Sequence, residues 1–181
     1  MFLALDYAFK NFCQRYSCYT YLYMINTVKQ FQVGDTAPDF TLPSTEGRDI
    51  ALSELKGKRV VLYFYPKDMT PGCTIEAHEF SALAEKFTGK EIILYGISPD
   101  SIESHHEFIV KEHITFPLLA DEDHKTAEAY GVWVEKSMYG KKYMGIDRST
   151  FVIGPDGKLE AVYSKVKPEG HATCVLEDLK A

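Results

Sequence analysis

Cysteine and tryptophan are scarce in this sequence. Four cysteines and one tryptophan occur among 181 residues, and four cysteines are too few for a secreted scaffold held together by disulfides. They lie at Cys13, Cys18, Cys73 and Cys174, and none of them forms the C-x-x-C pair that is typical of a zinc site. The cysteines of this chain are therefore either inert or reactive.

An excess of basic charge is also missing. Twenty Lys and Arg residues stand against 26 Asp and Glu residues, and the formal net charge is −6. Nucleic-acid binding usually needs a basic face, so the charge argues against that class. Apolar residues at 45% and charged residues at 25% exclude a mostly disordered chain, a collagen or a coiled coil. The length predicts one domain, large enough to build a core without disulfides.

The first 23 residues hold eight of the 24 aromatic side chains, yet they lack the order of a targeting signal. They are also too polar and too short to span a membrane. We expect residues 1–30 to be a poorly ordered extension and residues 31–181 to be the single domain. Whether residues 1–23 are translated depends on which start site is used. The alternative is a functional tail in which Cys13 or Cys18 takes part in redox chemistry. Without a targeting segment, the expected location is the cytoplasm.

The order of elements predicts the fold. Residues 60–65 and 92–97 are apolar runs that suit strands covered on both faces. The helical stripe between them ends at Gly89 and completes a βαβ unit; its members are Phe80, Leu83, Ala84 and Phe87. A second helix is expected to begin at residues 99–101. Further elements are expected at residues 40–42 and 49–52 (a hairpin), 114–119 (a strand), 126–130 (a helix), 149–153 and 159–163 (a hairpin), and 171–180 (a helix).

This order indicates an α/β protein with a thioredoxin-like fold: a central mixed β-sheet flanked by helices, with an extra N-terminal β-hairpin. In the helix that begins after Ser101, we expect Ile102 and Ile109 to form the inner face. His105 and His106 are adjacent on that helix and point to different faces, so we expect no metal site there.

Cys73 occupies the most informative position. Pro71 and Gly72 set a turn directly after a buried strand, and Cys73 then falls in the first turn of a helix. Free backbone N–H groups and the positive end of the helix dipole favour an anion there, and a thiolate is such an anion. Thr70 can turn its hydroxyl toward the sulfur or a substrate. The alternative is a buried cysteine that acts as a small hydrophobe, which this flanking sequence does not favour.

Arg148 is the best candidate for a cationic partner. When a thiolate breaks a peroxide O–O bond, charge develops on the leaving oxygen, and nearby cations or N–H donors stabilise it. Arg148 directly precedes a strand of the predicted hairpin, and its guanidinium is always charged, with several donors in a fixed fork. The alternative is a surface arginine paired with Asp147 or another acid.

These residues carry a resemblance. Pro66, Thr70, Cys73 and Arg148 match the P-x-x-x-T-x-x-C motif and the distal arginine of the peroxiredoxins. The wider sequence resembles the bacterioferritin comigratory protein subfamily over about residues 31–180. The matching segments are residues 63–68, 70–74, 96–101, 116–119, 130–132 and 148–153.

The resemblance implies a thiol-specific peroxidase for hydrogen peroxide and organic hydroperoxides, active in antioxidant defence. Cys73 would be the peroxidatic nucleophile and pass through a sulfenic acid. Thr70 and Arg148 would hold the peroxide and the thiolate, and Pro66 would shield the sulfur from water. We expect no cofactor and no metal. The expected partners are the peroxide and a reductant, thioredoxin or a low-molecular-weight thiol, and the expected state is a monomer or weak homodimer.

The sequence departs from the subfamily at one position. Many members carry a second cysteine five residues after the first, where this chain has His78. An external thiol that attacks the sulfenic acid is the preferred interpretation. Cys174 or a cysteine of the tail remains a candidate resolving residue, although the pattern favours Cys174 as a packed residue of the closing helix. We expect His78 to be exposed, and the role of Glu76 stays open.

Two other functions use the same fold. A thiol–disulfide oxidoreductase usually has two close cysteines in C-x-x-C, whereas Cys73 is followed by Thr74, Ile75 and Glu76. A redox sensor would oxidise Cys73 with little peroxidase turnover, and steady peroxide consumption would distinguish the two.

Overall fold

A computed structural model of the chain describes residues 31–138 and 140–179. The expected extension over residues 1–30, with Cys13 and Cys18, lies outside these residues, and the domain boundary stays a prediction. None of the helices in the described part is long and apolar enough to cross a membrane.

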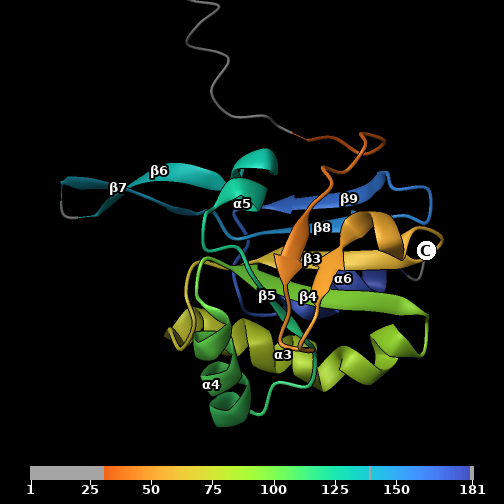
Figure 1. Cartoon of the computed structure of the whole chain (residues 1–181), viewed down its shortest axis with the longest axis horizontal. Coiled ribbons are helices and arrows are strands. Elements are labelled where there is room, and N and C mark those ends of the chain that lie inside the picture. Colours follow the sequence, from red (N-terminus) through yellow and green to blue (C-terminus); the bar gives the residue numbers. More distant parts are fainter. Residues whose placement is uncertain (1–30, 139, 180–181) are drawn as a thin grey trace, which may run out of the picture. The chain divides into compact units, whose positions relative to one another are not determined.

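Five strands in the order β5-β4-β3-β8-β9 form the central sheet (Figure 1). The parallel strands are β3 (Arg59–Phe64), β4 (Ile92–Ser98) and β5 (Leu118–Ala120). On the other side of β3, the antiparallel strands are β8 (Ser149–Ile153) and β9 (Leu159–Ser164). The predicted mixed sheet and its C-terminal hairpin are thereby confirmed.

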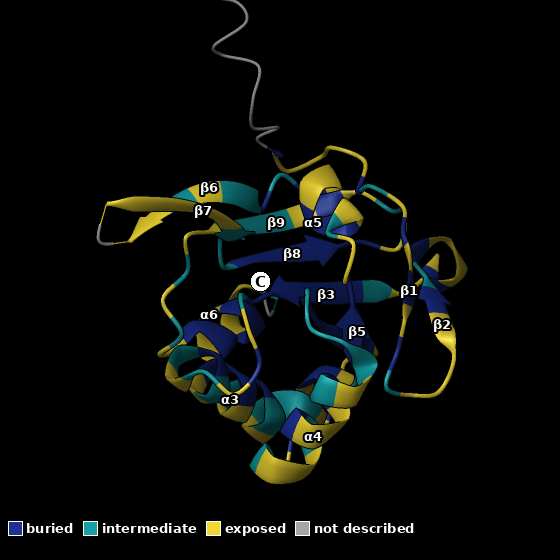
Figure 2. Cartoon of the chain, turned by 60° about the vertical axis from the view of Figure 1, so that its left-hand side comes forward, coloured by how far each residue is buried: buried dark blue, intermediate teal, exposed yellow. Residues whose placement is uncertain are grey.

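The central strand β3 is buried on both faces because successive side chains alternate between two apolar clusters. Val61 and Tyr63 face the apolar cluster to which three helices contribute side chains. The three helices lie together below the sheet in Figure 2. They are α3 (Pro71–Thr88), α4 (Ile102–Glu112) and α6 (His171–Asp178). Val60 and Leu62 face the other cluster, which α5 (Lys125–Ala129) covers.

Helix α3 positions the site, and its sequence explains where it begins and ends. Pro71 occupies the first helical position, where its missing N–H costs nothing. The buried face includes Phe80 and Phe87, and the N–H of Gly89 closes the last turn on Glu85. The predicted helix and its end are confirmed.

Two hairpins lie outside the central sheet. The predicted one consists of β1 (Thr41–Pro43) and β2 (Asp49–Ala51), followed by the 3-10 turn η1 (Leu52–Leu55). The other, β6 (Trp133–Met138) with β7 (Lys141–Ile146), was not expected. It projects from the rest of the fold (Figure 1), and its mostly exposed residues carry little of the apolar alternation that predicts a strand.

Two expectations were wrong in detail. The third strand begins at Leu118 because Thr115 bonds Ser81 of α3 instead of β4, through both its N–H and its hydroxyl. On α4, the fully buried residues are His105 and Phe108. Ile109 packs partly buried against the same core, as expected, whereas Ile102 does not belong to that cluster.

Candidate active site

Cys73 lies in the first turn of α3, directly beyond the carboxyl end of β3. Ligands of α/β sheets bind at such strand ends. The thiol is free and only 1% exposed. Nη2 of Arg148 lies 3.2 Å from its sulfur and donates a hydrogen bond. The cysteine and the arginine that were predicted to act together are therefore in contact.

Glu76 is the second partner of Arg148. It lies one helical turn after Cys73, is fully buried, and accepts a short hydrogen bond from Nη1 of Arg148. The arginine thus bridges a thiol and a carboxylate on one face of α3. Arg148 therefore pairs with another acid, as the alternative allowed, but it is no surface arginine, since its side chain is only 13% exposed. Asp147 lies 3.8 Å from Lys136 instead.

Burial sets the electrostatics of this cluster. It raises the pKa of Glu76 to about 7, against the attraction of Arg148. Burial opposes the charge of Arg148, yet Glu76 and Cys73 raise the pKa of the guanidinium above its ordinary value. Oε1 of Glu76 is buried without a partner among the described residues. The guanidinium of Arg148 therefore stays charged beside the sulfur of Cys73, and the carboxyl group of Glu76 has a pKa of about 7.

Thr70 and Pro66 flank the sulfur in the chain. Thr70 is the residue before α3, and its hydroxyl donates to the carbonyl of Lys67 at 2.9 Å. A hydroxyl that donates one hydrogen bond can still accept another. Pro66 follows the last buried residues of the β3 run and is partly buried. Their expected roles toward a substrate stay predictions.

Two further residues at this site escaped the sequence analysis. The hydroxyl of Tyr63 is buried and has no hydrogen-bond partner within the part of the chain that the structure describes. Burial, then Glu76 and Cys73, raise the pKa of Tyr63 well above its ordinary value. His171 places Nε2 2.8 Å from the hydroxyl of Thr150, and burial together with Arg148 lowers the pKa of His171 to about 4. Neither residue carried a recognised signal in the sequence, whereas Glu76, whose role the sequence left open, lies in line with the apolar stripe of α3.

The remaining cysteine is placed differently from the expectation. Cys174 was expected to pack in the closing helix, but its side chain is exposed and its sulfur lies 3.9 Å from Oδ2 of Asp178. The predicted apolar face of α6 is formed by its neighbours Val175 and Leu176. His78 is exposed, as expected, and lies 3.2 Å from Glu112.

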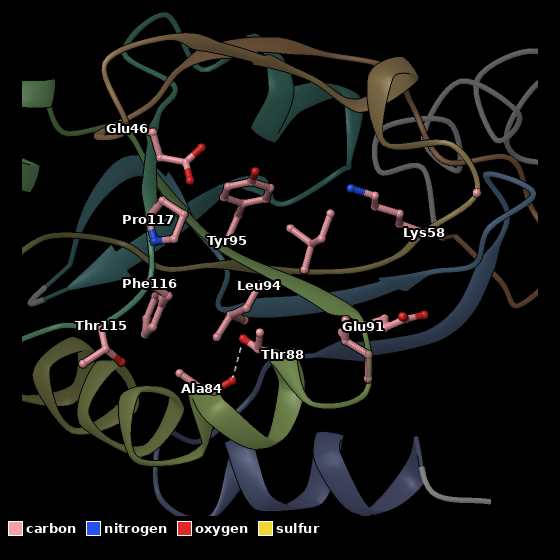
Figure 3. A pocket seen from close by; sticks show the side chains of 13 residues that line it. Glu46, Lys58, Ala84, Thr88, Glu91, Leu94, Tyr95, Thr115, Phe116 and Pro117 are labelled. Atoms are coloured by element: carbon pink, nitrogen blue, oxygen red, sulfur yellow. Dashed lines mark hydrogen bonds between the residues drawn. The ribbon is translucent and has the colours of Figure 1, made fainter.

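The site does not coincide with the cavity shown in Figure 3. That cavity has a volume of about 610 Å³ and lies along the first half of β4, where Leu94, Tyr95 and Phe116 line it. Because β3 and β4 are parallel, this part of the sheet is opposite the end where Cys73 lies. Within the described residues, no group of three or more His, Cys, Asp and Glu side chains could hold a metal ion.

Comparisons with known proteins agree with this geometry. The model of the AhpC/TSA family matches residues 33–162. Peroxiredoxin Bcp of Bacillus subtilis is 48% identical over 149 residues, which are 82% of this chain and 95% of that protein.

Two solved structures are also similar. One is the bacterioferritin comigratory protein of Xanthomonas campestris, described for its alkyl peroxide reduction activity. It is 42% identical with a TM-score of 0.74, and the match covers 78% of this chain and 90% of that chain. The other is a yeast mitochondrial 1-Cys peroxiredoxin, described for thiol resolution via glutathione and thioredoxin systems, with 26% identity, a TM-score of 0.71 and coverage of 84% and 76%.

Proposed function

The chain belongs to the AhpC/TSA family as a peroxiredoxin of the bacterioferritin comigratory protein type, and we propose that Cys73 is its peroxidatic residue. The protein is a thiol peroxidase, an oxidoreductase that acts on a peroxide and a thiol. The observation that carries the assignment of Cys73 is the hydrogen bond from Arg148 to its sulfur, at the first turn of α3.

The first step is oxidation of the sulfur. The Cys73 thiolate attacks the hydroxyl oxygen of the peroxide and forms an S–O bond, while the O–O bond breaks. The other oxygen takes a proton and leaves as water or an alcohol, so Cys73 becomes a sulfenic acid. Arg148 stabilises the thiolate before the attack and the developing charge during it, because its donors are already oriented by Glu76.

Thr70 and Pro66 complete the proposed site. The hydroxyl of Thr70, just before α3, donates to the carbonyl of Lys67. It accepts a hydrogen bond from the peroxide and so orients the peroxide for attack. Pro66 keeps water from the nearly inaccessible sulfur of Cys73. Organic hydroperoxides belong among the substrates, supported by the alkyl peroxide reduction described for the Xanthomonas relative.

An external thiol resolves the sulfenic acid in this proposal. It condenses with Cys73 to a mixed disulfide and releases water, and a second thiol then restores Cys73. His78 stands where a local resolving cysteine is common, and the exposed Cys174 directs its sulfur to Oδ2 of Asp178 on its own helix, at 3.9 Å. Thioredoxin and glutathione are the proposed reductants, supported by the yeast 1-Cys relative. Cys13 and Cys18 stay predicted alternatives.

The decisive experiment treats the reduced protein with one equivalent of hydrogen peroxide and locates the oxidised residue by mass spectrometry. We expect a sulfenic acid on Cys73, no peroxide consumption by Cys73→Ser, and normal consumption by Cys174→Ser. Peroxide consumption by Cys73→Ser at the wild-type rate would overturn the assignment. A disulfide between Cys73 and Cys174 would overturn resolution by an external thiol.

Neither a redox sensor nor a thiol–disulfide oxidoreductase is favoured by an observation. Steady turnover with thioredoxin or glutathione is the expected result, and a single oxidation without turnover would indicate the sensor. A monomer or weak homodimer in the cytoplasm remains our proposal. Sedimentation across a concentration series tests the oligomeric state.

A further inference from the structure

The loop that leads to Cys73 contains a buried acid which the proposed chemistry does not use. Asp68 lies between β3 and α3 and is 5% exposed. Its Oδ1 accepts from the hydroxyl of Tyr65 at 2.7 Å, and its Oδ2 accepts from the hydroxyl of Ser104 at 2.8 Å. Nδ1 of the fully buried His105 lies 2.8 Å from the same Oδ2. The carboxylate therefore ties the loop to helix α4.

The partners of His105 determine how many protons the pair holds. Nε2 lies 3.2 Å from the carbonyl oxygen of Leu119, and a carbonyl oxygen only accepts, so Nε2 carries a hydrogen. Nδ1 faces Oδ2 of Asp68, which would repel it if neither atom carried a proton. One proton therefore lies between Asp68 and His105, on either atom, and the buried pair is neutral overall.

The main chain of the loop is anchored at the same place. The N–H of Asp68 donates to Oδ2 of Asp100 at 2.8 Å, and the hydroxyl of Ser98 donates to that oxygen at 2.8 Å. The next residue, Met69, has φ of +57°, a left-handed conformation that disfavours side chains with a Cβ and persists only where neighbours enforce it. Asp68 on one side and α3 on the other supply that constraint.

We propose that Asp68 and His105 are positioning residues of the peroxidase. Their shared proton holds the segment from Pro66 to Thr70 in the conformation that aligns Cys73 with its peroxide. This inference rests on Cys73 as the peroxidatic residue. The two side chains act through the loop, since Thr70 follows Met69 directly and its carbonyl accepts the N–H of Thr74 in the first turn of α3.

The test compares two reactions of Cys73 in each variant: oxidation by hydrogen peroxide and alkylation by iodoacetamide. Oxidation needs the hydroxyl of Thr70 aligned with the peroxide, whereas alkylation needs only an accessible thiolate. In His105→Phe and Asp68→Ala we expect the oxidation rate constant to fall roughly ten- to a hundredfold, with alkylation unchanged or faster. An unchanged oxidation rate, or an equal fall in both reactions, would overturn the proposal.

Conservative variants separate the shared proton from simple packing. In Asp68→Asn the amide N–H can donate to a neutral Nδ1 of His105 while the amide oxygen still accepts from Tyr65. We expect this variant to oxidise at nearly the wild-type rate. If it is as slow as Asp68→Ala, the shared proton is refuted. His106→Ala is the matched control, because His106 is the exposed neighbour of His105 and should leave both reactions unchanged.

Two further results keep the inference testable on its own. In the wild-type protein, nuclear magnetic resonance should detect a downfield, exchange-protected proton near Nδ1 of His105, and its absence would refute the pair even if the variants failed to fold. Cys73→Ser distinguishes the two proposals. If that variant still consumes peroxide, the assignment of Cys73 fails. If it does not and His105→Phe oxidises normally, only the positioning role fails.

Discussion

Arg148 and Cys73 are 75 positions apart in the chain, and Nη2 of the arginine lies 3.2 Å from the cysteine sulfur. The contact forms because β8 pairs with β3. Arg148 directly precedes β8, and Cys73 follows the carboxyl end of β3 after a short loop. Antiparallel pairing places these two strand ends at the same edge of the sheet.

Replacement of Arg148 should slow the oxidation of Cys73. Arg148→Ala removes a donor aimed at the developing charge, and we expect a loss of about a hundredfold in the rate constant with hydrogen peroxide. Arg148→Lys keeps the charge but loses the fork that also reaches Glu76, so an intermediate rate is expected. Stopped-flow oxidation measures both. The control is Arg59→Ala, which breaks an ion pair with Glu160 at the surface; equal losses in the control would contradict the assignment.

Glu76 should make stability depend on pH in a defined direction. Its pKa is raised by burial to about 7 in the folded chain, so the folded state binds more protons than the unfolded state between about pH 4.5 and 7. The contribution of Glu76 is full below that window and is lost as pH rises through it. Compared with Glu76→Gln, the wild type should lose on the order of 3 kcal/mol of unfolding free energy across the window. Urea unfolding at several pH values measures the difference, and a flat difference would contradict the prediction.

His171 should produce the opposite trend. Its pKa is lowered by burial and by Arg148 to about 4, so the unfolded chain binds the extra proton first as pH falls from 6.5. Between pH 6.5 and 4, the unfolding free energy of the wild type should therefore fall by roughly 1–3 kcal/mol relative to that of His171→Gln. The comparison with a variant isolates this group from Glu76. A difference in unfolding free energy between the wild type and His171→Gln that stays constant over this pH range would refute the explanation.

Gly96 should resist enlargement. A Cβ at this position would lie 2.7 Å from Leu118 and 2.8 Å from the ring of Tyr63, both buried. Because close-packed side chains have no room to move, Gly96→Ala should destabilise the fold by about 1–3 kcal/mol. Gly145→Ala, whose Cβ would meet its nearest neighbour at 3.4 Å, is the control. Thermal unfolding compares the two variants. Equal melting temperatures would show that Leu118 and Tyr63 can move to make room, which contradicts the prediction.

The part of the site that could be predicted from the sequence is the part that is local in the chain. Pro71, Cys73 and the apolar stripe of α3 are neighbours in sequence, so turn chemistry and helical periodicity were enough to place the thiol in a first helical turn. The strands β3, β4, β8 and β9 were found because each is a short apolar run bounded by turn residues. The hairpin of β6 and β7 was missed because its residues are mostly exposed and its pattern is weak.

The sequence by itself predicted the candidate nucleophile, the order of most elements and the type of sheet, since these depend on residues within one or two turns or strands. Only the tertiary structure decided which charges meet. Glu76 could have been a solvated helix residue, and Cys174 a packed one. The structure buries the first against Arg148 and exposes the second. Asp68 and His105 likewise meet across 37 positions. Such pairings depend on how sheet order and helix packing bring distant segments together, and no local pattern encodes that distance.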